Sequence, residues 1–326
     1  LMFVAWLGQG LGQPVRGGEP EESVVRVFAS LRPPNPFRPW VRQNVVESTG
    51  TGVVLDGKTI LTNAHVVQYA SQVTIQSPRG GDRYEAVVSA LGPEIDLATL
   101  TLEDESFFES SKPMPRAESR PAPNSPVAVY GFPLGGNGAA VTRGVVSRID
   151  YGPYEDGASG MRIQVDAAVN PGNSGGPALV DGRMIGLTFG QLGMAENVGY
   201  VVPNEEIDAF LEDVKDGRYD GKHRAYDSFQ TLENPALRAS LGLDRSVRGV
   251  IVRRPWRTDE DYPLREFDVI TQIGGLDVDN EGFVDLDGVR LPFIAAIPRN
   301  VQDGRVAATI IRQKESRPVQ LEVSRE

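Results

Sequence analysis

The sequence predicts a mostly β protein with two domains, and three observations support this prediction. The chain has 326 residues, which at roughly 150 residues per domain corresponds to about two domains. Glycine contributes 36 residues and proline 24, well above the usual ~12% for the pair. Between residues 23 and 200, short apolar or alternating runs are separated by Gly, Pro, Asn and Asp clusters, a pattern that indicates strands rather than helices.

The first domain is expected over residues 22–214. Its apolar runs predict strands that include residues 52–55, 73–76, 127–131 and 184–188. One helix is expected at its end, where Asn204 is a candidate N-cap and apolar side chains repeat at helical spacing up to Val214. Residues 215–225 are polar and rich in glycine, and they predict a linker.

A smaller domain is expected over residues 226–326. Asn234 and Pro235 predict the start of a short helix that ends at Gly242. The remaining pattern predicts a compact sheet with a second short helix. Its strands are expected at 249–253 and 269–273, its second helix near 292–297, and its hairpin between 306–312 and 319–323.

The composition excludes several kinds of chemistry. Cysteine is absent, which rules out disulfides, thiol nucleophiles, Cys-rich zinc sites and iron–sulfur clusters. Histidine occurs only as His65 and His223, so any histidine-dependent reaction has two candidates. The net charge of −11 argues against a general nucleic-acid or anionic-membrane binder. No cofactor or metal ion is required by any motif found.

The first residues predict an export signal. Residues 1–21 begin with an apolar run of about seven followed by small residues, too short to span a bilayer, which needs about 20. We interpret this segment as the truncated end of a signal peptide and leader, since the chain begins with leucine. The expected location is therefore periplasmic or otherwise extracytoplasmic, or organellar in a eukaryote, without stable membrane insertion.

A glycine-rich turn at residues 170–177 contains the candidate nucleophile, Ser174. Acyl transfer needs a nucleophilic oxygen beside backbone donors that stabilise an oxyanion, and the N–H groups of Gly172 and Ser174 could supply them. An ordinary glycine-rich loop is the alternative. The pattern also fits the G-x-S-x-G elbow of α/β hydrolases, but the strand–turn–helix context is missing, because residues 178–182 indicate a hairpin.

Ser174 needs a base, and His65 ends an apolar run that could hold one rigidly. His223 lies among charged residues and is expected to be solvated. The base in turn needs a buried carboxylate, and Asp96 is favoured because it interrupts an apolar run where an unpaired charge is costly. Asp166 is the main rival, expected instead to brace the serine loop. Four other aspartates are expected in turns: Asp82, Asp104, Asp150 and Asp156.

The order His65, Asp96, Ser174 is that of the chymotrypsin-like double β-barrel. With that order established, the chain resembles the HtrA/Deg serine proteases, a trypsin-like domain followed by PDZ domains, and most closely the longer plant-type Deg proteins. The resemblance covers residues 22–214 strongly and 226–326 moderately. The segments that carry it are 51–54, 61–67, 96–98, 131–135, 170–177, 200–203, 234–238 and 288–293.

The resemblance implies a serine endopeptidase that degrades unfolded or damaged proteins in protein quality control, as a trimer-based homo-oligomer. It assigns His65 as base, Asp96 as its orienting acid and Ser174 as nucleophile. The implied oxyanion donors are the N–H groups of Gly172 and Ser174, helped by Asn173. The implied substrate contacts are uncharged, which predicts a preference for small or medium aliphatic residues: Thr188, Phe189, Gly190 and Ala168.

One position departs from the family pattern. PDZ domains bind a peptide C-terminus on a loop that needs a glycine, and Asp227 stands where the resemblance places that glycine. We expect a carboxylate there to repel a C-terminus, so that this PDZ-like domain packs against the protease or a neighbouring subunit instead. Two alternatives to an active protease stay open: a latent peptide-binding or chaperone-like module on the same fold, and an α/β-hydrolase esterase.

Overall fold

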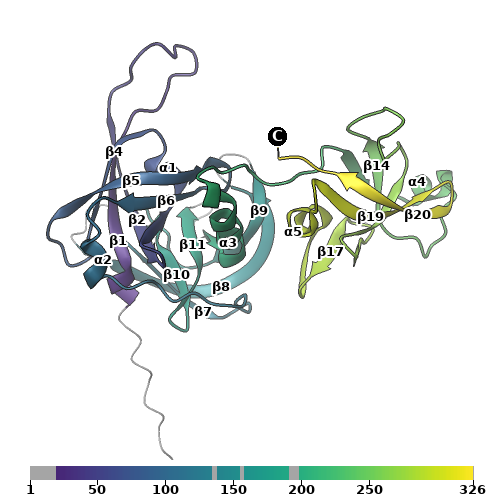
Figure 1. The fold of residues 1–326 in the computed structure, drawn as a ribbon. Coiled ribbons are helices and arrows are strands. Elements are labelled where there is room, and N and C mark those ends of the chain that lie inside the picture. Colours follow the sequence, from purple (N-terminus) through teal and green to yellow (C-terminus); the bar gives the residue numbers. More distant parts are fainter. Residues whose placement is uncertain (1–19, 134–137, 155–157, 191–197, 326) are drawn as a thin grey trace, which may run out of the picture.

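The computed structural model describes residues 20–133, 138–154, 158–190 and 198–325. It confirms the mostly β fold with two closed six-stranded barrels followed by a separate sheet (Figure 1). The segment interpreted as a truncated signal lies outside the described residues, apart from its last two positions. No helix in the described ranges is both long and apolar enough to cross a membrane.

The first barrel closes in the order β1-β2-β3-β6-β5-β4. Its elements are η1 (Pro20–Ser23), β1 (Val24–Leu31), β2 (Val46–Leu55), β3 (Thr59–Thr62), α1 (Ala64–Val67), β4 (Ala70–Gln76), β5 (Arg83–Gly92), η2 (Pro93–Ile95), β6 (Leu97–Leu102) and α2 (Phe107–Ser110). The pairing of β3 with β6 places Thr62 opposite Ala98. This register brings the segment after β3 close to the segment before β6.

The second barrel closes in the order β10-β11-β12-β9-β8-β7. Its elements are β7 (Pro126–Gly131), β8 (Ala140–Pro153), β9 (Ser159–Val165), β10 (Pro177–Val180), β11 (Arg183–Gly190), β12 (Gly199–Pro203), α3 (Asn204–Asp213) and η3 (Val214–Asp216). The predicted hairpin turn is confirmed by the positive φ of Asp181 and Gly182.

The prediction that Asn204 caps the helix α3 is wrong. Pro203 occupies the N-cap and Asn204 is the first helical residue. Its side-chain amide instead donates hydrogen bonds to the carbonyl oxygens of Ala117 and Met184, at 2.9 and 2.7 Å. Two backbone carbonyl oxygens in the barrel wall therefore outcompete the helix start for this side chain.

The C-terminal unit is a sheet in the order β13-β14-β15-β19-β20, with β16 beside β15 and a separate β17–β18 pair. Its elements are β13 (Ser228–Thr231), α4 (Pro235–Ser240), β14 (Val250–Arg254), β15 (Val269–Ile273), β16 (Leu276–Asp277), β17 (Phe283–Leu286), β18 (Val289–Pro292), η4 (Phe293–Ala296), α5 (Ile297–Asn300), β19 (Arg305–Arg312) and β20 (Glu315–Glu322). The predicted cap is confirmed, because Asn234 accepts from the N–H groups of Ala236 and Leu237.

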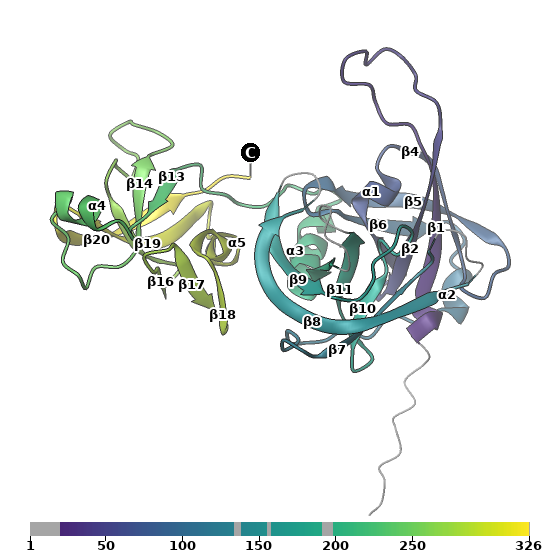
Figure 2. The ribbon, with the colours of Figure 1, turned by 180° about the vertical axis from the view of Figure 1, so that it is seen from behind.

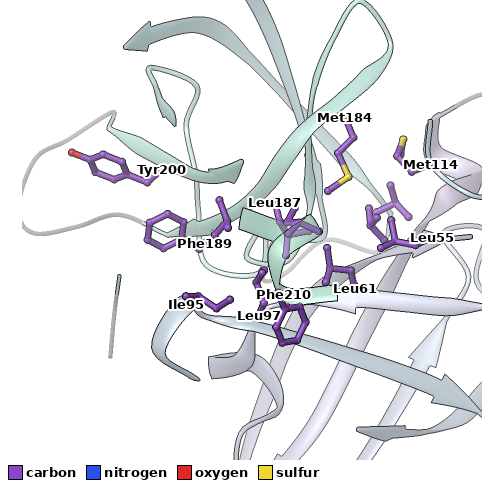
Figure 3. Close-up of a cluster of buried hydrophobic side chains, with 14 of the residues drawn as sticks. Leu55, Leu61, Ile95, Leu97, Met114, Met184, Leu187, Phe189, Tyr200 and Phe210 are labelled. Carbon is purple, nitrogen blue, oxygen red and sulfur yellow. The ribbon is translucent and has the colours of Figure 1, made fainter. Parts of the chain in front are cut away.

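One apolar core is shared by the two barrels. Leu61 and Leu97 from the first barrel and Leu187 and Phe189 from the second belong to the same buried cluster (Figure 3). Phe210 of α3 is 1% exposed and packs into it. The barrels are therefore fixed to one another by a common core, which gives a rigid frame to any site built from both.

The C-terminal unit packs against the second barrel (Figure 2). Met161 of β9 forms a buried cluster with Leu286, Leu291 and Ala295. Arg120, only 13% exposed, donates to Glu205 of α3 at 2.6 Å and to the carbonyl of Leu286 at 2.7 Å. A small apolar contact and a buried arginine therefore join the unit to the barrel.

The segment predicted as a linker also lies against the barrel. Lys222 pairs with Glu206 at 2.7 Å, and both side chains are nearly buried. His223, expected to be solvated, is half-buried with its ring 3.3 Å from the Arg325 guanidinium, so that expectation is wrong. Burial, followed by the Arg325 charge, lowers the pKa of His223.

Candidate active site

His65 and Asp96 form a tight pair at the edge of the first barrel. Asp96 is 2% exposed, and its carboxylate accepts from Nδ1 of His65 at 2.8 and 3.0 Å. The backbone N–H of His65 also donates to this carboxylate, at 2.9 Å. Because a carboxylate only accepts here, the ring proton sits on Nδ1 and the Nε2 lone pair is left for another partner.

The backbone around Asp96 is shaped for this pairing. Asp96 ends η2 with φ of 55°, a left-handed conformation that aspartate tolerates better than most residues. Its neighbours Ile95 and Leu97 are both buried in the shared core, and its carbonyl accepts from the Asn63 side chain at 2.8 Å. The backbone that carries the carboxylate is therefore held in place by contacts other than those with His65.

Ser174 lies in the turn-rich loop between β9 and β10, and it is half-buried. Two tight turns shape this loop: the N–H of Asn173 donates to Asn170 O, and the N–H of Gly176 donates to Asn173 O, each at 2.9 Å. Gly172, with φ of 98°, supplies the positive φ that the first turn requires. The chain beyond Gly176 continues as β10 and not as a helix, which speaks against the α/β-hydrolase elbow.

Thr51 of β2 ties the serine loop to the first barrel. Its N–H donates to Ser174 O at 2.8 Å, and its hydroxyl donates to Gly172 O at 2.7 Å. Its carbonyl accepts from the hydroxyl of Thr62, three residues before His65, at 2.7 Å. One threonine thus links the loop of the candidate nucleophile to the strand that leads to the candidate base.

Close backbone contacts explain two glycines of this region. A Cβ on Gly175 would lie 2.0 Å from Thr51 O, so only glycine lets the loop approach β2. A Cβ on Gly50 would lie 2.7 Å from a methyl of Val66 and 3.2 Å from Ser174 O. Gly50 therefore lies between the helix that carries His65 and the loop that carries Ser174.

The described residues leave two backbone donors of the serine loop without an acceptor: the N–H groups of Gly172 and Ser174 form no hydrogen bond within these ranges. Free backbone N–H groups in a tight turn of this kind can stabilise an oxyanion. Asn173 is 1% exposed, and its side-chain oxygen finds no partner among the same residues. Its side chain points into the protein against Gly131, so it contributes to the shape of the loop.

The four residues predicted to contact substrate differ in their burial and in their hydrogen bonds. Thr188 is fully buried, and its N–H and hydroxyl donate to Gly176 O while its carbonyl accepts from the N–H of Gly175. Its visible role is therefore to anchor the serine loop. Phe189 is buried in the shared core, Gly190 has open space at its Cα, and Ala168 is half-buried.

The competing aspartates lie elsewhere. Asp166 accepts from the N–H of Val145 in β8 and has no contact with His65 among the described hydrogen bonds, and its expected bracing of the serine loop stays a prediction. Asp150 is not a free turn residue, because it lies in β8 and pairs with Arg162 at 2.6 Å. Asp82 and Asp104 are exposed, and Asp156 lies outside the described residues.

Asp227 differs from its expected arrangement. Its side chain does not face outward but is 8% exposed, accepting from the N–H of Trp256 at 2.9 Å and from the hydroxyl of Tyr262 at 2.8 Å. Burial raises the pKa of this carboxyl. Repulsion between Asp227 and a bound C-terminus is therefore the wrong physical reason for weak peptide binding, because the carboxylate already accepts from two donors inside the unit.

Sequence reasoning missed Thr51 and the anchoring role of Thr188. Thr51 was part of a recognised segment, but nothing in its neighbourhood indicates partners 121 residues away. A threonine within a buried strand predicts only that its hydroxyl has some hydrogen-bond partner. It does not indicate which residue that partner is. Only the closure of the two barrels specifies which acceptor that is.

The paired barrels define a trypsin-like fold, and the His65–Asp96 pair and the glycine-rich serine loop lie on it. Residues 50–187 match the family model of the trypsin-like peptidase domain. Protease Do-like 4, mitochondrial, of Arabidopsis thaliana is 38% identical over 267 residues, covering 80% of this chain and 51% of the relative. Protease Do-like 2, chloroplastic, of the same plant is 39% identical over 307 residues, covering 92% and 50%.

Solved structures share the fold. The HtrA-type protease AlgW with a decapeptide has a TM-score of 0.69 at 22% identity, covering 94% of this chain and 96% of that one. The serine endoprotease from Yersinia pestis has a TM-score of 0.59 at 19% identity, covering 94% and 95%. The chain is a homologue of the Deg/HtrA serine proteases, as its sequence motifs predicted. It spans about half the length of the curated relatives that it matches.

Proposed function

We propose that the chain is a serine endopeptidase that cleaves peptide bonds through an acyl-enzyme. The observation that carries this proposal is the buried Asp96 carboxylate held on Nδ1 of His65, with Thr51 tying the Ser174 loop to the same barrel. A buried carboxylate on Nδ1 orients the imidazole and stabilises the imidazolium that forms during catalysis. The names of the homologues, which are proteases, support the same reaction class.

In the proposed mechanism, Nε2 of His65 removes the proton of Ser174 Oγ as that oxygen attacks the scissile carbonyl carbon. The oxyanion receives hydrogen bonds from the N–H groups of Gly172 and Ser174, whose loop is preorganised by two turns and by Thr51. The imidazolium then protonates the leaving amine. Water enters, His65 acts as base again, and hydrolysis of the ester regenerates Ser174.

The substrate class and the biological setting belong to the same proposal. AlgW was solved with a decapeptide, and homologues are named mitochondrial and chloroplastic. We infer that this chain acts on unfolded polypeptides in an organelle or outside the cytoplasm, as a homo-oligomer. Ala168 and Gly190 are uncharged, which favours substrates with a small or medium aliphatic side chain before the scissile bond.

Ser174→Ala tests the proposal directly. Removal of Oγ is expected to abolish casein cleavage and labelling by a fluorophosphonate probe, while the melting temperature stays unchanged because backbone groups hold the loop. Ser77→Ala, at a turn serine of the first barrel, is the matched control and should label and cleave like the wild type. A wild-type chain that folds but neither labels nor cleaves would instead be a latent binding module.

A further inference from the structure

The loop of residues 32–45, which joins β1 to β2, exposes large apolar side chains. It rises above the first barrel and stands clear of the rest of the chain in both views (Figures 1 and 2). Phe37 is 90% exposed and Trp40 is 79% exposed, the two highest values among the exposed large hydrophobic residues. A projecting tip with two aromatic side chains in water indicates a surface that is covered by a partner.

The loop is also locally cationic. Arg32, Arg38 and Arg42 are exposed, and residues 32–46 contain no aspartate or glutamate. None of these arginines takes part in an ion pair within the described ranges, although the chain as a whole has a net charge of −11. The loop is therefore a positive, aromatic projection on an acidic protein, and its partner should be anionic.

Most positions of the tip either have no backbone N–H group or have one that is already hydrogen-bonded within the tip. Of the nine residues 33–41, four are prolines, which have no N–H group. The N–H groups of Phe37 and Arg38 donate to the Asn35 side chain at 2.9 and 3.1 Å, and the N–H of Val41 donates to Arg38 O at 2.9 Å. Few backbone donors therefore lose a water partner if this tip leaves water, which lowers the cost of entering an apolar phase.

We propose that loop 32–45 docks this protein onto an anionic phospholipid bilayer. Phe37 and Trp40 project from a convex tip, so they can be buried only in a partner that has a cavity or that deforms around them. The headgroup region of a bilayer deforms in this way. Tryptophan and phenylalanine favour that interface, and arginine binds its phosphates. The net charge of −11 does not oppose this docking, because the loop projects from the acidic body. At physiological ionic strength, repulsion between the bilayer and charges more than about 8 Å away is largely screened.

Docking through this loop also orients the candidate active site. The N–H of Arg32, at the base of the loop, donates to Tyr69 O at 2.9 Å, and Tyr69 lies four residues after His65. The base of the loop therefore lies beside the short helix that carries His65. A docked molecule holds this edge of the first barrel toward the membrane, where polypeptides on the bilayer surface can reach it.

Co-sedimentation of the full chain with vesicles tests the proposal. Wild type should bind phosphatidylcholine vesicles that contain 30% phosphatidylglycerol, and bind phosphatidylcholine alone much more weakly. Each arginine near an anionic surface contributes about fivefold in affinity, so R38Q/R42Q should weaken binding about 30-fold. F37S/W40S should abolish binding, whereas W256S, at an exposed tryptophan of the C-terminal unit, should have no effect.

Fluorescence locates the contact within the chain. The sequence has three tryptophans, and W6F/W256F leaves Trp40 as the sole emitter, whose emission should shift to the blue with anionic vesicles. Unchanged binding of F37S/W40S would overturn the proposal and assign the membrane contact to another segment, such as the apolar residues 1–7. If these variants lose binding to reduced casein instead, the loop is a polypeptide-binding surface and the bilayer proposal is wrong. Circular dichroism checks that each variant is folded.

Discussion

Asp96→Asn tests the central pair of the site. The substitution keeps the size of the side chain, and asparagine tolerates the positive φ of 55° at this position. In the wild type, one carboxylate accepts from both the His65 N–H and Nδ1. An amide has a single acceptor oxygen, so if that oxygen keeps the backbone N–H, the amide NH₂ faces Nδ1. Nδ1 must then accept, and the ring proton moves to Nε2.

A His65 that carries its proton on Nε2 cannot take one from Ser174. In the serine protease template this change lowers kcat about 10⁴-fold with the geometry intact, which corresponds to about 5.4 kcal/mol of barrier. We expect a loss of that size in kcat/KM for casein at neutral pH, with the melting temperature nearly unchanged. Asp82→Asn, in an exposed loop, is the matched control. Activity of folded Asp96→Asn within tenfold of wild type would refute the assigned roles.

Three further predictions concern the support of the site and the C-terminal unit. Gly50→Ala should cost about 1–3 kcal/mol of stability and reduce activity, because its Cβ meets Val66; Gly138→Ala, which meets nothing within 4 Å, should match wild type in thermal unfolding. Ser174→Ala protein should bind a fluorescent peptide no more tightly with a free C-terminus than with an amidated one, since the Asp227 carboxylate already occupies nearby donors; anisotropy measures both affinities, and tighter binding of the free acid contradicts it. The folded-state pKa of His223 lies below its unfolded value of about 6.5, so the unfolded chain binds the proton more readily. The free energy of unfolding should thus fall as pH drops below that value, and less so in His223→Gln, as urea titrations would show.

Much of the fold and the pairing of His65 with Asp96 could be predicted from the sequence, because local patterns specify them. Asn234 and Gly242 bound their helix as expected, since capping and a positive φ are local requirements. Asp96 was identifiable because an unpaired carboxylate between Ile95 and Leu97 would be costly. The small number of histidines also helped, because only one of the two, His65, was a plausible base.

The remaining features depend on topology. Asn204 has the composition of an N-cap, yet its amide bonds two carbonyls that only barrel closure brings near. Arg120 lies in an unremarkable surface segment of the sequence, but it reaches Leu286, 166 residues away, and joins the C-terminal unit to the barrel. Long-range hydrogen bonds of this kind leave no periodic or compositional signal, so sequence patterns cannot assign their partners.

The candidate active site is built from the two barrels alone among the described residues, and this limits what the C-terminal unit can do. Every residue described here as holding His65, Asp96 or the serine loop lies between Gly50 and Thr188, nearly the range that matches the trypsin-like peptidase domain. The unit instead contacts β8, β9, α3 and residues 215–225. Together with Ile95, it lines a cavity of about 140 Å³. Since Asp96 directly follows Ile95, that wall is a physical route from the unit to the candidate active site. Loss of the unit's contacts should therefore change the rate through the position of Asp96, and not through the identity of the reacting groups.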